Sequence, residues 1–132
     1  MSKKLPDNVN YQRKDMFKVA FSGIKVAFKE EKNLQFDFIM AMMVTGCGFL
    51  FHVSKIEWLF LIFAMSQVII AEMTNTVIEN IVDFICPEYN LQAKKIKDLA
   101  CGMVLSACIF SAIIGLLIFV PYIFRIGGFY VI

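Results

Sequence analysis

The sequence predicts an all-α integral membrane protein with three transmembrane helices preceded by an N-terminal amphipathic surface helix. The chain has 132 residues, of which 59% are hydrophobic, and its mean hydropathy is +0.70. A soluble domain of this length could not bury so much apolar surface, because small domains keep a large share of their surface exposed. Several apolar runs also reach the roughly 20 residues that a helix needs to cross a bilayer.

The surface helix is expected at about residues 13–31, after a flexible tail at residues 1–12. Its apolar face is formed by four residues at helical spacing, Phe17, Phe21, Ile24 and Phe28. Its basic residues repeat on a neighbouring face, at Lys14, Lys18, Lys25 and Lys29. A helix with such faces suits a membrane surface. The alternative is an ordinary cytosolic helix that packs against a partner protein.

Residues 13–132 are expected to form one membrane domain with spans at about 34–53, 58–85 and 99–122. The second span ends before Pro87, because a residue that precedes proline avoids the α conformation. The segment 87–98 is predicted to be a polar, basic loop. The third span carries four small residues that permit close helix approach, Gly102, Ala107, Ser111 and Gly115.

The basic residues predict the orientation of the chain in the cell membrane. Of the 13 lysines and arginines, eight precede residue 33 and three lie in segment 87–98. Only Lys55 and Arg125 remain for the opposite side. By the positive-inside rule, the N-terminus and segment 87–98 are expected in the cytoplasm of a multi-pass protein.

A polar stripe interrupts the second span. Its members, Glu72, Asn75, Glu79 and Asp83, fall within an arc of about 80° on a helix. A charge at helix-centre depth costs about 2.5–3.5 kcal/mol, so the stripe is expected to face protein, a cation or water. Asp83 could simply be solvated beyond the bilayer. Glu72 could not, because only uncharged residues separate it from Glu57, and we expect it to be functional.

Glu31 lies where the surface helix gives way to the first span, at a depth that Glu79 could share. Two carboxylates near a phosphate favour Mg²⁺, which prefers oxygen ligands and binds through one or two carboxylates and substrate phosphates. The chain contains no standard nucleotide-binding motif. Composition and spacing therefore indicate only a membrane protein with a functional acidic site near its cytoplasmic face.

Three segments resemble the small prokaryotic diacylglycerol kinase family: EMTNTVIENIVDF at 72–84, PEYN at 87–90 and AKKIKD at 93–98. Two more, FKEEKN at 28–33 and IEWLFL at 56–61, are similar to the undecaprenol kinase branch of Gram-positive bacteria. The resemblance implies an ATP-dependent lipid kinase that phosphorylates the hydroxyl of undecaprenol. The alternative substrate is diacylglycerol, which would give phosphatidic acid.

The resemblance also implies roles for individual residues. Glu72 would be the catalytic base, Glu31 and Glu79 would hold Mg²⁺ on ATP, and Asn75 and Asp83 would orient the site. Two turns would contact the nucleotide, the first with Glu88, Tyr89 and Asn90 and the second, near the phosphates, with Lys97 and Asp98. The family pattern is not kept at Gln12, Val19 and Asn90.

The expected partners are ATP, a membrane lipid alcohol and further copies of the chain in a homotrimer, because family members form active sites where subunits meet. Nucleic acid is not an expected partner. Two other classes of protein remain as alternatives. One is a small proton-coupled exporter that uses Glu72, although such exporters usually have four spans. The other is a membrane subunit without catalytic activity.

Overall fold

The computed structural model describes residues 13–126, so the predicted flexible tail lies outside the described residues. Within this range the regular structure consists of α1 (Arg13–Glu30), α2 (Lys32–Leu50), α3 (Lys55–Ile85) and α4 (Leu91–Ile126). The last three of these helices are each long and apolar enough to cross a membrane. The predicted fold class, three spans after a shorter helix, is therefore confirmed.

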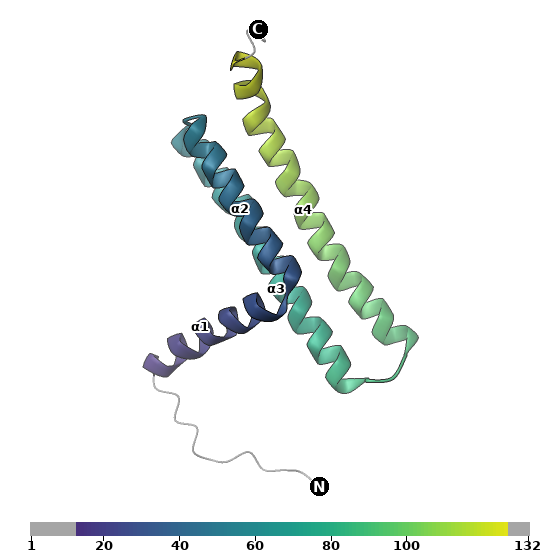
Figure 1. Cartoon of the computed structure of the whole chain (residues 1–132). Helices are drawn as coiled ribbons and strands as arrows, with labels where there is room; N and C mark the ends of the chain where they lie inside the picture. The colour runs from purple at the N-terminus through teal and green to yellow at the C-terminus, as the bar shows by residue number, and fades with distance from the viewer. Residues whose placement is uncertain (1–12, 127–132) are drawn as a thin grey trace.

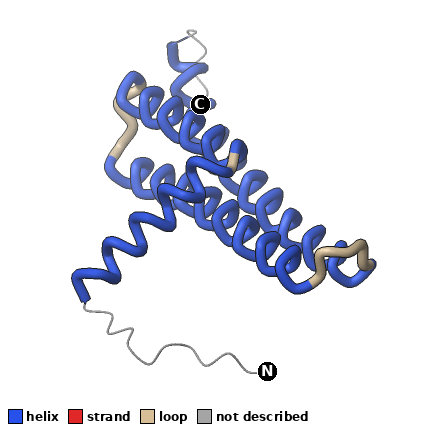
Figure 2. Tube along the Cα trace, turned by 60° about the horizontal axis from the view of Figure 1, so that its bottom comes forward, coloured by secondary structure: helices blue, strands red, loops and turns tan. Residues whose placement is uncertain are grey.

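The helices α2, α3 and α4 run alternately in opposite directions along one bundle (Figure 1). Seen from a second direction, α1 leaves this bundle as a separate arm (Figure 2). It leaves at the end of α2 that lies toward the connection between α3 and α4. The two segments richest in lysine thus lie toward the same end of the molecule.

Glu31 alone joins α1 to α2, with an extended backbone (φ −102°, ψ 110°). The amide of Gln35 bridges the junction, because its Nε2 donates to the backbone oxygen of Phe28 at 2.9 Å. The Phe28 ring also meets Phe38 edge-on, with ring centroids 5.2 Å apart. These contacts fix the direction in which α1 departs. In the single chain Phe17 and Phe21 are exposed, as expected for a face that lies against a membrane.

A short turn reverses the chain between α2 and α3. His52 has a positive φ of 50° there, which is uncommon for a residue other than glycine. Ser54 and Glu57 then form a capping box, in which each side chain accepts a hydrogen bond from the backbone N–H of the other residue. This cap starts α3 at Lys55, three residues before the predicted start of the second span.

Trp58 packs against α2 where α2 has a glycine. A Cβ atom added to Gly48 would lie 2.7 Å from the indole ring, closer than two carbon atoms can approach without strain. The Phe49 ring lies beside the same indole, with centroids 5.0 Å apart. Gly48 therefore allows the tryptophan of α3 to sit directly on the backbone of α2.

The predicted loop at 87–98 is wrong for most of its length, because α4 begins at Leu91. The side-chain oxygen of Asn90 accepts hydrogen bonds from the backbone N–H groups of Gln92 at 2.7 Å and Ala93 at 3.3 Å. An asparagine in this position is a strong helix start. The predicted end of α3 before Pro87 is confirmed. The helix α4 runs through Pro121 and beyond the predicted limit at residue 122.

Three polar contacts tie α3 to α4 along its length. Lys97 donates to Asp83 at 2.6 Å at one end, and Tyr122 donates to Glu57 at 2.7 Å at the other. Between them the hydroxyl of Ser111 donates to the backbone oxygen of Ala64 at 2.9 Å. The prediction for Ser111 as a site of close approach is therefore confirmed. At Gly102 and Gly115 an added Cβ would meet nothing within 4 Å, so close packing within the chain does not occur there.

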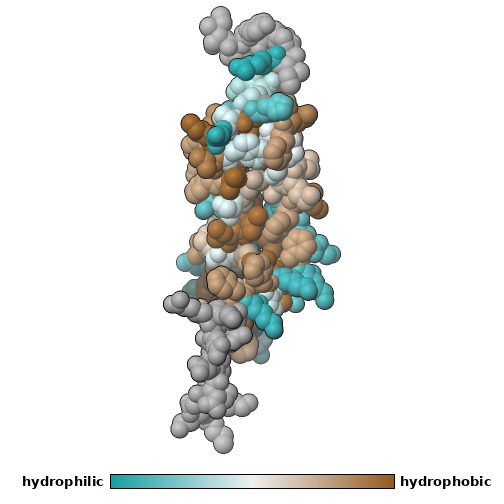
Figure 3. Space-filling view, turned by 90° about the vertical axis from the view of Figure 1, so that its left-hand side faces the viewer, coloured by the Kyte–Doolittle hydropathy of each residue, from teal (hydrophilic) through white to brown (hydrophobic). Residues whose placement is uncertain are grey.

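Few large side chains are buried in the single chain. A small core joins the turn, α3 and α4 through Val53, Leu61 and Ile118. Most other large apolar residues are exposed. The space-filling view shows them as a broad apolar zone with hydrophilic residues toward the ends (Figure 3). Such a surface suits a lipid environment, since water-soluble monomers rarely expose apolar patches of this extent.

Candidate active site

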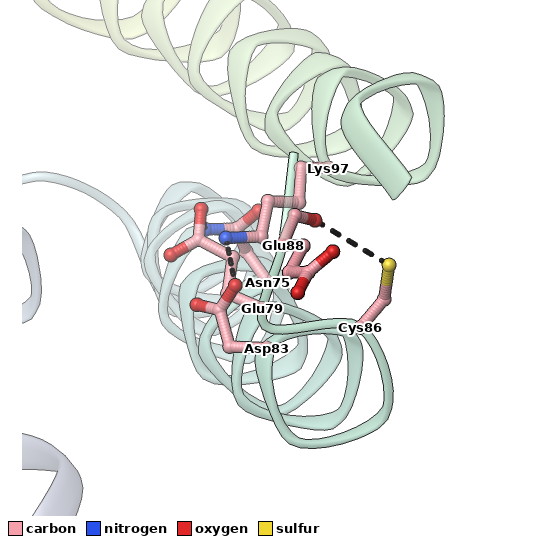
Figure 4. Close-up of polar contacts among 6 residues, drawn as sticks. All are labelled: Asn75, Glu79, Asp83, Cys86, Glu88 and Lys97. Carbon is pink, nitrogen blue, oxygen red and sulfur yellow. Dashed lines mark hydrogen bonds and ion pairs between the residues drawn. The ribbon is translucent and has the colours of Figure 1, made fainter. Parts of the chain in front are cut away.

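The stripe on α3 passes from the buried interior to the exposed end of the helix. Glu72 and Asn75 are only 8% and 9% exposed, Glu79 is half-buried and Asp83 is exposed. The amide nitrogen of Asn75 donates to Glu79 at 3.1 Å, and Figure 4 shows both residues with Asp83 on the same helix. The stripe thus connects a shielded carboxylate with a surface that water can reach.

The fold gathers further carboxylates around Glu72. Glu31, Asp37 and Glu79 all lie near enough to interact with it electrostatically. The structure therefore places Glu31 and Glu79, the predicted metal ligands, within electrostatic range of Glu72, the predicted base. Asp37 is a fourth acid, to which the sequence analysis gave no role. An acidic residue in an apolar run was a visible signal, but its neighbours depend on how α2 packs against α3.

Two oxygen atoms in this region are buried without a hydrogen-bond partner among the described residues, Asp37 Oδ2 and Asn75 Oδ1. An unpaired buried acceptor costs about 1–3 kcal/mol, so native structures retain few of them. Both atoms can accept a hydrogen bond or bind a cation. Among the described residues, these two oxygen atoms therefore have neither a hydrogen-bond donor nor a positive charge to bind.

The donor set fits a metal ion that arrives with a ligand. Carboxylate and amide oxygens are the ligands that Mg²⁺ prefers. Within residues 13–126 no three His, Cys, Asp or Glu side chains are arranged as a metal site of their own. Mg²⁺ usually takes one or two carboxylates and completes its shell with water and phosphate oxygens, so a metal ion here would need a ligand that brings further oxygens.

A second cluster lies where α3 and α4 meet their connection. Figure 4 shows Lys97 reaching from α4 to Asp83 on α3. The thiol of Cys86 donates to the backbone oxygen of Glu88 at 3.4 Å, a contact within the connection between α3 and α4 (Figure 4). Lys97 therefore places a positive charge beside the exposed end of the acidic stripe.

The other residues predicted to contact the nucleotide do not form a single cluster. Tyr89 is 81% exposed, and the side chain of Asn90 caps α4. Lys97 and Asp98 lie within α4 and not in a turn, which corrects that expectation. Asp98 forms an ion pair with Lys94 one helical turn away. Gln12 lies outside the described residues, and Val19 is an exposed residue of α1.

Comparison with known proteins gives a consistent result. The model of the family described as prokaryotic diacylglycerol kinase matches residues 18–119. An undecaprenol kinase of Bacillus subtilis is 40% identical over 99 residues, which cover 75% of this chain and 80% of that protein. A diacylglycerol kinase of Synechocystis is 31% identical over 106 residues, 80% of this chain and 61% of that protein. One from Helicobacter pylori is 33% identical over 104 residues, 76% of this chain and 81% of that protein.

Proposed function

Because this chain belongs to the prokaryotic diacylglycerol kinase family and is a multi-pass membrane lipid kinase, we propose that it transfers the γ-phosphate of ATP to the hydroxyl of undecaprenol. The observation that carries the proposal is the buried Glu72, which has three further carboxylates around it. The choice of lipid rests on the 40% identity to an undecaprenol kinase, against 31% and 33% to diacylglycerol kinases. Diacylglycerol is the alternative substrate.

Glu72 acts in this proposal as the general base. Its carboxylate takes the proton of the lipid hydroxyl while the hydroxyl oxygen bonds to the γ-phosphorus and the bond to the β-phosphate oxygen breaks, which releases ADP. At 8% exposure the carboxylate is largely screened from water, so water would compete poorly with the lipid alcohol for phosphate. General bases of this kind contribute about 10²–10⁴-fold to the rate.

Glu31 and Glu79 would hold Mg²⁺ together with ATP. When bound, the ion neutralises the charge that phosphoryl transfer would otherwise leave unbalanced. Asn75 fixes the orientation of Glu79 through the 3.1 Å hydrogen bond and keeps its free oxygen for the substrate or the ion. Lys97 supplies positive charge from α4 once it exchanges Asp83 for a phosphate. The exposed residues Glu88, Tyr89, Asn90 and Asp98 would contact the rest of the nucleotide.

The same proposal includes the orientation and assembly of the protein. The N-terminus and the α3–α4 connection face the cytoplasm, where ATP is available, in agreement with the positions of the lysines. The protein acts as a homotrimer. A neighbouring copy would supply a donor for Asp37 Oδ2, which has none among the described residues of one chain.

Phosphate transfer from γ-labelled ATP by the purified protein tests the proposal, with undecaprenol and diacylglycerol offered separately and Mg²⁺ present or withheld. Glu72→Gln is expected to lower kcat by about 10²-fold or more and to leave Mg·ATP binding unchanged. Glu79→Gln is expected to weaken Mg·ATP binding. Glu30→Gln, the same change at an exposed neighbour of the site, is the control and should retain activity.

The outcomes separate the alternatives. Labelled diacylglycerol as the main product would overturn the choice of lipid and keep the mechanism. Near-normal turnover by Glu72→Gln would remove Glu72 as the base. Absence of any labelled lipid, whatever the metal, would favour the exporter or the subunit without catalytic activity.

A further inference from the structure

One ion pair joins the acidic stripe of α3 to α4 at the end of the bundle that carries their connection. The Nζ atom of Lys97 donates to Oδ1 of Asp83 at 2.6 Å (Figure 4). The two residues are 14 positions apart in the chain and lie on different helices. The contact therefore depends on how α4 packs against α3, and it determines where the charge of Lys97 lies.

The two other lysines at the start of α4 do not reach α3. Lys94 pairs with Asp98, one turn further along its own helix, and Lys95 forms no ion pair among the described residues. The side chain of Lys97 is 34% exposed, against 57% for Lys94, in keeping with its path across to α3. Lys97 is therefore the lysine of α4 that brings its positive charge to the acidic stripe.

The surroundings of this pair are acidic. Asp83 lies one helical turn beyond Glu79 on the same face of α3, and Glu79 interacts electrostatically with Glu72. An ammonium group binds a carboxylate oxygen and a phosphate oxygen in the same way, through charge-assisted hydrogen bonds. If a phosphate arrived while Asp83 kept its contact, one positive charge would face two anions that repel each other. A phosphate and Asp83 are therefore competitors for Lys97.

The pair is weak enough to be exchanged. In the single chain the side chain of Asp83 is 63% exposed, and ion pairs between exposed side chains change an equilibrium by about fivefold or less. A hydrogen bond to a charged group changes an equilibrium roughly tenfold or more. Lys97 therefore gains when it leaves Asp83 for a nucleotide phosphate, but the gain is reduced by the contact that it gives up.

We infer that Asp83 is a counter-ion that takes the place of a nucleotide phosphate on Lys97 while the site is empty, and that ATP and ADP must displace it. This inference rests on the proposed function and adds to it a control of nucleotide affinity within the same site. Asp83 touches no reacting atom and is a positioning residue, which keeps Lys97 turned toward the stripe and recaptures it when ADP leaves. The apparent affinity is lowered by the fraction of the protein in which Asp83 holds Lys97.

Asp83→Asn tests the inference, because it keeps the size of the side chain and removes its charge. The dissociation constants of Mg·ADP and of a non-hydrolysable ATP analogue with Mg²⁺ are measured by equilibrium dialysis of the purified full-length protein in detergent. We expect both to fall by about two- to fivefold, as for the loss of an exposed ion pair. The rate of a single turnover at saturating ATP should change by less than about twofold, whereas a damaged site would turn over more slowly.

Two controls separate the loss of this contact from a general loss of negative charge. Glu30→Gln removes one charge from an exposed residue that forms no ion pair among the described residues, and it should change the dissociation constants by less than about 1.5-fold. The second control adds Asp83→Asn to Lys97→Met. With no lysine to release, Asp83→Asn should then have no more effect than Glu30→Gln.

The sign of the change decides the inference. A residue that only orients the site strengthens nucleotide binding, so weaker binding by Asp83→Asn would overturn the inference. Unchanged binding would overturn it too, and so would a gain in affinity that persists when Lys97 is methionine. The proposed function fails separately. A wild-type protein that binds these nucleotides but phosphorylates neither undecaprenol nor diacylglycerol would refute the proposed function and leave the test of Asp83 valid, whereas absence of nucleotide binding would refute both.

Discussion

Ser111→Ala removes the hydrogen bond from Ser111 to Ala64. This bond lies between the two other polar contacts that join α3 to α4 at their ends. The donor and acceptor are 2.9 Å apart, and Ala64 is only 5% exposed. The carbonyl of Ala64 keeps its helical hydrogen bond from the residue four positions on, so the substitution leaves no unpaired acceptor. Interhelical bonds in membranes average about 0.6 kcal/mol and reach about 1.7. We expect a loss of about 0.5–1 kcal/mol in the free energy of unfolding.

The free energy of unfolding is to be measured by titration with SDS in mixed micelles. Ser106→Ala is the matched control, because Ser106 is an exposed residue of the same helix whose hydroxyl donates to its own helix at Gly102. Both variants gain the same small benefit in helix propensity from alanine. The difference between them therefore isolates the contact between the helices. Equal stabilities of the two variants would refute the contribution assigned to that contact.

Five further substitutions test a helix cap, an ion pair and its lysine, and the packing at two glycines. Asn90→Ala should cost about 1 kcal/mol through the lost cap of α4, visible as faster amide exchange in the first turn of that helix, and unchanged exchange would count against the cap. Lys97→Met should raise the KM for ATP roughly tenfold or more, as expected for a lost bond to a charged phosphate. Asp83→Asn, which removes an exposed ion pair, should alter stability by less than about 1 kcal/mol. Gly48→Ala should lower the unfolding free energy by about 1–3 kcal/mol through overpacking, while Gly46→Ala, with open space, should not lower it in the same titration.

The helices were largely predictable because most of their signals are long. An apolar run of bilayer length has few alternatives. A residue that precedes proline is disfavoured in the α conformation, which predicted the end of α3 before Pro87, although Pro121 does not end α4. Contacts made by single side chains were harder to predict from the sequence than whole helices. Asn90 precedes a polar, lysine-rich segment, and its polarity suggested a loop although asparagine is also a preferred cap. Ser54 and Glu57 have the spacing of a capping box, which would have predicted that α3 begins before residue 58.

The candidate site was predictable in its residue types and not in its geometry. Glu72 could be selected because a buried charge in a span is costly and must have a reason. The proximity of Asp37 to Glu72 depends on the rotation of α2 about its axis, which an apolar helix with no strongly polar face does not encode. The contacts of Ser111 and Tyr122 join residues 47 and 65 positions apart, and no local pattern predicts such pairs.

The junction at Glu31 has a mechanical consequence. A single residue separates α1 from α2, and the amide of Gln35 ties the last turn of α1 to the first turn of α2, so no flexible segment absorbs a change in the angle between the two helices. The sequence predicts that the apolar face of α1 lies on the bilayer surface, and α2 is long and apolar enough to cross the bilayer. A thinner or more curved membrane that tilts one helix against the other must therefore displace the Glu31 carboxylate relative to Glu79. In the proposed function, the angle between α1 and α2 would therefore influence where Glu31 lies in the metal site.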